Sequence, residues 1–354
     1  GTLDIALIGG NNGNTGRAYW QGTANASPLI CASCATNNGA YLNAKGNQYI
    51  GSAANKVSSL VLTGGSQGNG NDAWIDSEGA EQKIYVTNVL SLNGGASGGL
   101  YVPGFGLDGM ISNGAGITTS GIQTIDVTGD LTLRALGDTA TVGGATILAP
   151  VQRITVGGNL TLAGGASNAT SYVEPTSGVK IAAGVLLGNL TAADVQIGVG
   201  GTFTMTPGSG NGGSVLLGAI NGGAGNAISV QAANIAIGTT GVPSIAGIGS
   251  LDGTQATITL NDTGSGGEML LDDRTRIAAG SGSVALRTTG GDGIHLAPNT
   301  RIFTRDLLVD SADYFRLRGQ ISATGDVTVA TGSYVWLDAD RAGSATFLRA
   351  GGTM

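Results

Sequence analysis

The sequence has 354 residues, a net charge of −7 and 41% hydrophobic residues, but only 11% charged residues where soluble domains average about 25%. The hydrophobic fraction excludes global disorder, and 65 glycines without a Gly-X-Y period, beside only 7 prolines, exclude collagen. The acidic balance without a stripe of Lys and Arg argues against a nucleic-acid partner, and no apolar run reaches the about 18 residues that a transmembrane helix requires.

Residues 1–105 form the first of three zones, and we expect them to be an irregular part of the fold. The segment 2–8 alternates as a strand does. Cys31 and Cys34 make a C-x-x-C pair, yet the only histidine is His295 and there is no other cysteine, so a four-ligand zinc site is incomplete. We favour a local disulfide, and inter-chain disulfides are the alternative.

Aromatic residues gather in this zone, which holds eight of the 16 in the chain. Exposed rings stack on sugars or build protein interfaces, whereas buried rings would close the open end of the core. The candidate interface aromatics are Tyr19, Trp20, Tyr41, Trp74 and Tyr101.

The second zone, residues 106–265, repeats one phrase of a strand, a glycine-containing corner and a second strand. Two copies are residues 125–133 (IDVTGDLTL) and 154–162 (ITVGGNLTL). An earlier copy begins at Ile84, and later ones begin at Val195 and Ile228, at longer and unequal spacings. Gly, Asn and Asp tolerate the backbone of a sharp corner. We therefore expect loose coils with glycine-rich excursions.

The third zone, residues 266–354, contains nine of the twelve arginines and the shortest repeat. Val309 is followed by Val329 after about 20 residues, which is within the range of periods that solenoids use. Leu296, Leu317 and Leu337 follow one another at nearly the same spacing, and the same alignment places Leu348 next after Val329.

Such a short period with at least two strands predicts stacked coils of a parallel β-helix, or β-solenoid, in an all-β chain. We expect a right-handed coil, although the period itself does not determine the hand. A β-sandwich or an antiparallel barrel is the alternative.

Candidate chemistry is weak along the whole chain. Residues 68–74 match most of one calcium nonapeptide, but real sites need consecutive copies. Asp272 and Asp273 are adjacent, so on a strand they point to opposite faces and do not form a hydrolase pair. We expect no catalytic residues, no metal site and no cofactor.

The phrases at residues 127–133, 156–162 and 325–331 resemble the repeats of filamentous-haemagglutinin-like and autotransporter-passenger surface proteins of Gram-negative bacteria. The resemblance covers residues 120–350. It implies export, display at the cell surface, and adhesion or fibre formation.

We therefore expect an extracellular structural protein, a mature or excised segment that builds a surface fibre by end-to-end association. The expected partners are further copies of the chain or neighbouring coils of a longer parent, since two open ends present unpaired strand edges. An adhesin shaft or tip that binds glycan is the first alternative, and a polysaccharide-active enzyme on the same fold is the second.

Overall fold

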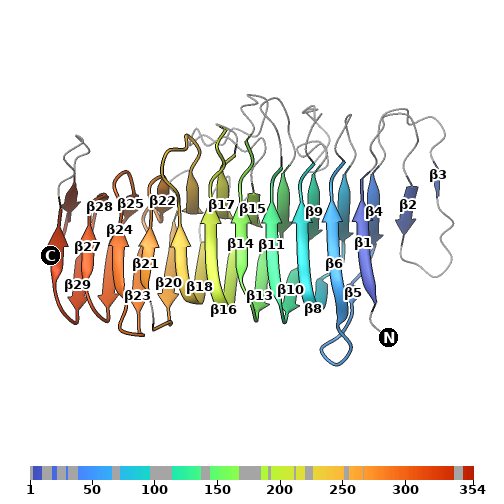
Figure 1. Cartoon of the computed structure of the whole chain (residues 1–354), viewed down its shortest axis with the longest axis horizontal. Coiled ribbons are helices and arrows are strands. Elements are labelled where there is room, and N and C mark those ends of the chain that lie inside the picture. Colours follow the sequence, from blue (N-terminus) through green and yellow to red (C-terminus); the bar gives the residue numbers. More distant parts are fainter. Residues whose placement is uncertain are drawn as a thin grey trace.

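The structure, a computed structural model, describes residues 3–9, 18–21, 29–30, 39–65, 72–95, 114–136, 144–166, 185–189, 193–210, 213–219, 226–250, 255–265, 267–338 and 346–354. The regular secondary structure in these ranges consists of β-strands only. The strands stack into an elongated column with the two chain ends at opposite ends (Figure 1). They belong to an 18-stranded and a 13-stranded sheet.

The larger sheet contains two ladders of paired strands, because its longest strands turn a corner and serve both. The first ladder comprises β5 (Gln48–Ile50), the first half of β8 (Glu81–Asn93), β10 (Ile122–Val127), β13 (Val151–Val156), the first half of β16 (Asp194–Thr206), the first half of β18 (Asn226–Ile237), β20 (Ala256–Asp262), β23 (Ser283–Thr288), β26 (Asp306–Ser311) and β29 (Val327–Thr331).

The second ladder runs beside the first. In order along the column, it comprises β1 (Asp4–Ile8), β6 (Val57–Thr63), the second half of β8, β11 (Asp130–Arg134), β14 (Leu160–Ala163), the second halves of β16 and β18, β21 (Glu268–Leu271), β24 (Gly293–Leu296), β27 (Phe315–Leu317) and β30 (Val335–Leu337).

The 13-stranded sheet is the third ladder. It comprises β3 (Leu29–Ile30), β2 (Ala18–Gln21), β4 (Ala40–Ala44), β7 (Ala73–Ser77), β9 (Ala115–Thr119), β12 (Ala145–Leu148), β15 (Val185–Asn189), β17 (Val215–Ala219), β19 (Ala246–Ser250), β22 (Thr275–Ala278), β25 (Arg301–Thr304), β28 (Gln320–Ala323) and β31 (Phe347–Arg349).

Parallel pairing is the rule in all three ladders. The described strand pairs are parallel, apart from the short antiparallel pair of β2 and β3. From β7 onward the chain visits the third, first and second ladders in turn before it returns to the third. An all-β chain of stacked parallel strands is thereby confirmed, and the antiparallel alternatives are excluded for the described strands.

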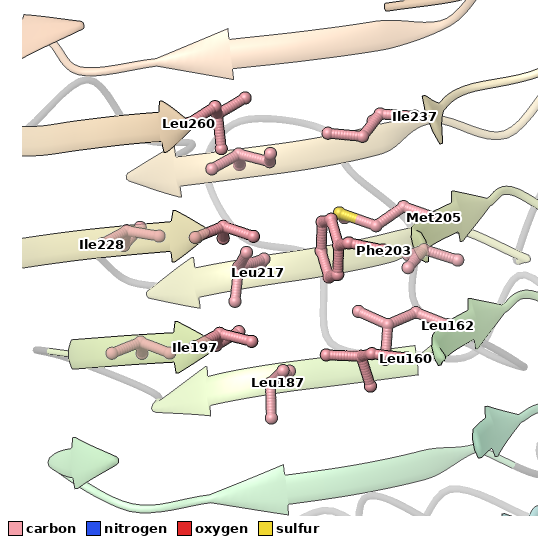
Figure 2. Close-up of a cluster of buried hydrophobic side chains, with 14 of the residues drawn as sticks. Leu160, Leu162, Leu187, Ile197, Phe203, Met205, Leu217, Ile228, Ile237 and Leu260 are labelled. Atoms are coloured by element: carbon pink, nitrogen blue, oxygen red, sulfur yellow. The ribbon is translucent and has the colours of Figure 1, made fainter. Parts of the chain in front are cut away.

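The core lies between the sheets and consists of the inward residue of every second position. Strand β10 alternates in burial along its length, and Ile125 and Val127 pair with Ile154 and Val156 of β13 as the repeated phrase predicted. Figure 2 shows the next rungs, in which Leu160 and Leu162 lie under their partners Phe203 and Met205.

A row of buried glutamines interrupts this apolar core. Gln48, Gln82, Gln123 and Gln152 occupy the same inward position on four successive rungs, and the last three are completely buried. The side-chain nitrogens of Gln82, Gln123 and Gln152 each donate to the amide oxygen one rung before, over 2.7, 2.7 and 3.1 Å, and that of Gln48 donates to the Leu42 carbonyl oxygen at 3.2 Å. On the fifth rung Val195 takes this position.

Glycine is required at one corner of the third ladder. Gly188, Gly218 and Gly249 pair in register with φ values of 147°, 130° and 104°. A Cβ on Gly218 would lie 2.5 Å from the carbonyl oxygen of Gly249. Side chains are thus excluded by backbone conformation and by the close approach of the next rung.

Two alignments from the sequence were wrong. Ile154 pairs with Ile197, not with Val195, because a slip by two positions keeps apolar side chains inward and the repeat alone does not reveal it. Leu348 pairs with Ile321 in the third ladder, so it is not the next rung after Val329. The alignments of Val309 with Val329 and of Leu317 with Leu337 are confirmed.

The division into zones 1–105, 106–265 and 266–354 stays a prediction. Strand pairing crosses both boundaries, since β8 pairs with β10 and β18 pairs with β21.

Candidate functional site

Two of the residues singled out from the sequence, Tyr41 and Trp74, lie in described strands of the third ladder. Cys31, Cys34 and Tyr101 fall outside the described residues, and so do the side chains of Tyr19 and Trp20 in β2. The disulfide and the interface role of these three aromatics therefore remain predictions.

Tyr41 and Trp74 are buried, with 6% and 4% of their surface exposed. The Tyr41 hydroxyl donates to Asp72 Oδ2 at 3.1 Å, and Trp74 Nε1 donates to Thr118 Oγ1 at 3.1 Å. The indole lies over Gly116, where a Cβ would come within 2.3 Å of the ring. We expected both residues as candidate interface aromatics, but rings buried in this way pack locally, which was the alternative.

Asp72 belongs to residues 68–74, which match most of one calcium nonapeptide, and its carboxylate accepts hydrogen bonds from other parts of the protein. Its Oδ1 accepts a hydrogen bond from the Gly114 backbone nitrogen at 3.1 Å, and its Oδ2 is the acceptor for Tyr41. Within the described ranges, no three His, Cys, Asp or Glu residues come together as a metal site would require.

The C-terminal rung, formed by β29, β30 and β31, leaves core positions uncovered. Val335 and Leu337 of β30 are inward residues in register with Phe315 and Leu317 of β27. One rung earlier these positions are fully buried, whereas Val335 and Leu337 are 49% and 57% exposed. The uncovered surface is therefore the end of the hydrophobic core itself.

Aromatic rings on the outward side of the same strands also stack along the column. Tyr334 stacks on Tyr314 with centroids 5.6 Å apart and planes 11° from parallel. The Arg316 guanidinium lies 4.8 Å from the Trp336 ring centroid and donates to Asp338 Oδ2 at 2.9 Å. Since Tyr314 precedes Tyr334 by one rung and the two rings are nearly parallel, the second face of Tyr334 is turned toward the C-terminal end, whereas the Trp336 ring is inclined by 62° to that of Tyr334.

Tyr314, the first ring of this stack, is fixed by contacts with residues of the preceding rungs. Its ring covers Gly293, where a Cβ would lie 2.4 Å from the ring, and its hydroxyl donates to Glu268 Oε2. His295 Nδ1 lies 3.3 Å from Glu268 Oε1. Burial, followed by the hydrogen bond to Glu268, raises the pKa of Tyr314 well above its usual range. The phenol therefore stays protonated and keeps its donor role.

Among the described strands, the N-terminal strand of the second ladder is paired on one side only, as β30 is. β1 pairs with β6 on one side, where Ile5 and Leu7 meet Leu60 and Leu62. Ile5 and Leu7 are half-buried inward residues, and Ile8 is exposed. An apolar pair at alternate positions thus occurs at both ends of this ladder.

The candidate functional site is accordingly the C-terminal rung with its stacked rings. Our reading of the sequence missed it because we weighed aromatic density, which favours residues 1–105. The signal was present: Tyr314 and Tyr334 repeat at the same spacing as the core residues beside them, and so do Arg316 and Trp336.

Comparisons with known proteins assign no relative to this chain: no protein-family model, no curated protein and no solved structure matches it. In the part of the chain that the structure describes, there is also no helix with the length and apolar character needed to cross a membrane.

Proposed function

We propose that the chain is a right-handed parallel β-solenoid that acts outside the cell as a structural building block of a surface fibre, formed when columns join end to end. The repeat phrases that resemble those of filamentous-haemagglutinin-like and autotransporter-passenger proteins support the extracellular, cell-surface role. A structural role, rather than a catalytic one, is proposed.

The uncovered core at the C-terminal rung carries this proposal. Complete burial of a Val or Leu side chain contributes about 1.5–3 kcal/mol. Because Val335 and Leu337 are about half exposed, covering them adds roughly 1 kcal/mol each to an end-to-end contact. No described strand pairs with β30 on its C-terminal side, so the backbone of this edge supplies hydrogen bonds in addition, in the manner of strand addition to a sheet edge.

At the neighbouring strand β29, the chain's own C-terminal residues already form hydrogen bonds with this edge. Val327 N donates to the Thr353 carbonyl oxygen at 2.9 Å, and Thr353 N donates to Asp326 Oδ1 at 2.8 Å. Parallel addition at this end of the column is therefore compatible with the geometry of the last rung.

The proposed occupant of β30 is β1 of a second copy. Alignment of Ile5 with Val335 and of Leu7 with Leu337 would continue both inward columns, because the members of each pair stand at alternate positions of their strand. Ala6 would then lie beside Trp336, and its small side chain leaves room for the indole ring. Head-to-tail contacts of this kind do not close on themselves and give filaments.

The experiment is electron microscopy and sedimentation velocity of the purified chain over a range of concentrations. Wild type should form rods that lengthen with concentration, and Val335→Arg should abolish them because it places a charge in the contact. Ile122→Arg is the matched control, since Ile122 is 48% exposed on an interior rung. Single columns at every concentration, or rods of Val335→Arg as long as those of wild type, would refute end-to-end self-association; neighbouring coils of a longer parent would then be the occupant.

A further inference from the structure

Two arginines lie side by side on the outer face of the third ladder, several strands away from the uncovered end. Arg276 of β22 pairs in register with Arg301 of β25. Their neighbours Ile277 and Ile302 are completely buried. Because side chains alternate between the two faces of a strand, both arginines project outward from adjacent rungs. Strands in a ladder lie about 4.8 Å apart, so the two positive charges are held close together.

Neither arginine has a carboxylate partner among the described residues. Elsewhere the chain does pair its arginines: Arg153 with Asp194 at 2.7 Å, and Arg305 with Asp306 at 2.7 Å. The Nε of Arg276 is also buried and has no hydrogen-bond acceptor. Like charges directly opposite each other destabilise a strand pair. Within the described part of the chain, this pair of charges is therefore left uncompensated.

Burial removes water from around Arg276, and no described carboxylate compensates its charge. The Phe303 ring centroid lies 5.7 Å from Arg276 Cζ, and the rung before Arg276 carries Gly247 at the same position. Burial, and to a smaller extent the charge of Arg301, lowers the pKa of Arg276. A guanidinium that is partly desolvated in this way binds an anion more strongly than one in open water does.

The guanidinium group presents several N–H donors in a planar fork that matches the oxygens of carboxylate, sulfate or phosphate. We propose that Arg276 and Arg301 together form a binding site for an oxyanion, supplied either as a free ion or as the acidic group of a polysaccharide. One oxyanion bound between the two guanidinium groups would reduce their mutual repulsion and accept hydrogen bonds from the N–H groups of Arg276. The site is independent of end-to-end assembly, because it involves none of the residues of the last rung.

The first test compares thermal unfolding in sodium sulfate and in sodium chloride at equal ionic strength. Sulfate stabilises most proteins by exclusion from their surface, so the control is Arg305→Gln, which also removes one positive charge. Wild type and Arg305→Gln should gain the same sulfate-specific increase in Tm, whereas Arg276→Gln and Arg301→Gln should lose part of it. In chloride, these two variants should be as stable as wild type or more so, because each relieves the repulsion. Equal sulfate increments in all four proteins would overturn the proposal.

Calorimetric titration then separates the two sources of the anion. The probes are inorganic sulfate, a sulfated oligosaccharide and the same oligosaccharide without sulfate. The site is supported if inorganic sulfate or the sulfated oligosaccharide binds at least tenfold more weakly to Arg276→Gln than to wild type, while its binding to Arg305→Gln is unchanged. Tighter binding of the sulfated oligosaccharide than of sulfate assigns it to an acidic polysaccharide, and the reverse assigns it to a free ion. Unchanged binding of both probes in Arg276→Gln would refute it.

Discussion

The buried glutamine row offers the sharpest test of how the N-terminal rungs hold their register. Gln123 stands in its centre: its Nε2 donates to Gln82 Oε1 and its Oε1 accepts from Gln152 Nε2. In Gln123→Leu the shape is nearly kept, but Gln82 Oε1 loses its donor in a buried position. Gln152 Nε2 keeps its second acceptor, the Ile147 carbonyl oxygen at 3.0 Å.

The expected cost follows from these contacts. A buried acceptor left without a partner costs about 1–3 kcal/mol, and a lost hydrogen bond costs about 0.5–1.5 kcal/mol. Burial of the more apolar leucine returns about 1 kcal/mol. Gln123→Leu should therefore destabilise the neighbouring rungs by about 0.5–3.5 kcal/mol. Replacement of all four glutamines by leucine removes the side-chain donors and acceptors of the row together, including Gln152 Oε1, which has no donor among the described residues. The remaining acceptors are the backbone carbonyl oxygens of Leu42, Thr118 and Ile147, and we expect the fourfold variant to cost less than the single substitution.

The assay is native-state hydrogen exchange, because stacked repeats need not unfold in one step. Peptides from β8, β10 and β13 should lose protection in Gln123→Leu and recover it in the fourfold variant, while β26 and β27 serve as the internal control. If the fourfold variant is less protected than the single one, the glutamines act as independent residues and the reasoning is wrong.

Two further predictions concern the same column. Gly218→Ala should destabilise the protein by at least about 1 kcal/mol in urea unfolding, because φ is 130° and the new Cβ meets the Gly249 carbonyl oxygen at 2.5 Å; Gly198→Ala, which meets no atom within 4 Å, should change the free energy of unfolding by less than about 0.5 kcal/mol. Burial raises the pKa of Asp262, although it accepts hydrogen bonds from Gly264 N and Ile235 N. A folded-state pKa above the unfolded value means that the folded protein binds the proton more tightly, so this group's contribution to stability should fall as pH rises from the unfolded pKa to the folded one. Urea unfolding of wild type and Asp262→Asn at several pH values on either side of the unfolded pKa of about 4 measures this slope, and equal slopes in the two proteins would contradict it.

Local sequence was sufficient where one coil follows another without an excursion. Leu296, Leu317 and Leu337 recur at nearly one spacing, and the structure pairs them as that spacing predicts. Where a long connection separates two coils, the spacing no longer indicates which residues pair. Between Ile154 and Ile197 the repeat allowed two registers that differ by two positions, and both keep branched apolar side chains inward.

Burial and exposure at the two ends were beyond the reach of the sequence. Trp74 looked like an exposed ring, but its fit over Gly116 depends on a residue that lies on the next rung and far away in the chain. Tyr334 and Trp336 were not singled out from the sequence. Their significance came from the rung on which they stand, after which the described strands of the second ladder end.

By itself, the sequence determined that the chain is built from short strands and tight corners, because alternating apolar residues and glycine-containing turns are local properties of the backbone, and the short period favoured stacked parallel strands over a sandwich or an antiparallel barrel. Only the tertiary structure decided which residues meet on neighbouring rungs. The glutamine row, the paired arginines and the uncovered leucine and valine all depend on that register. Register is fixed by the packing of the whole column, since each strand has acceptable partners at several offsets and the core selects one of them.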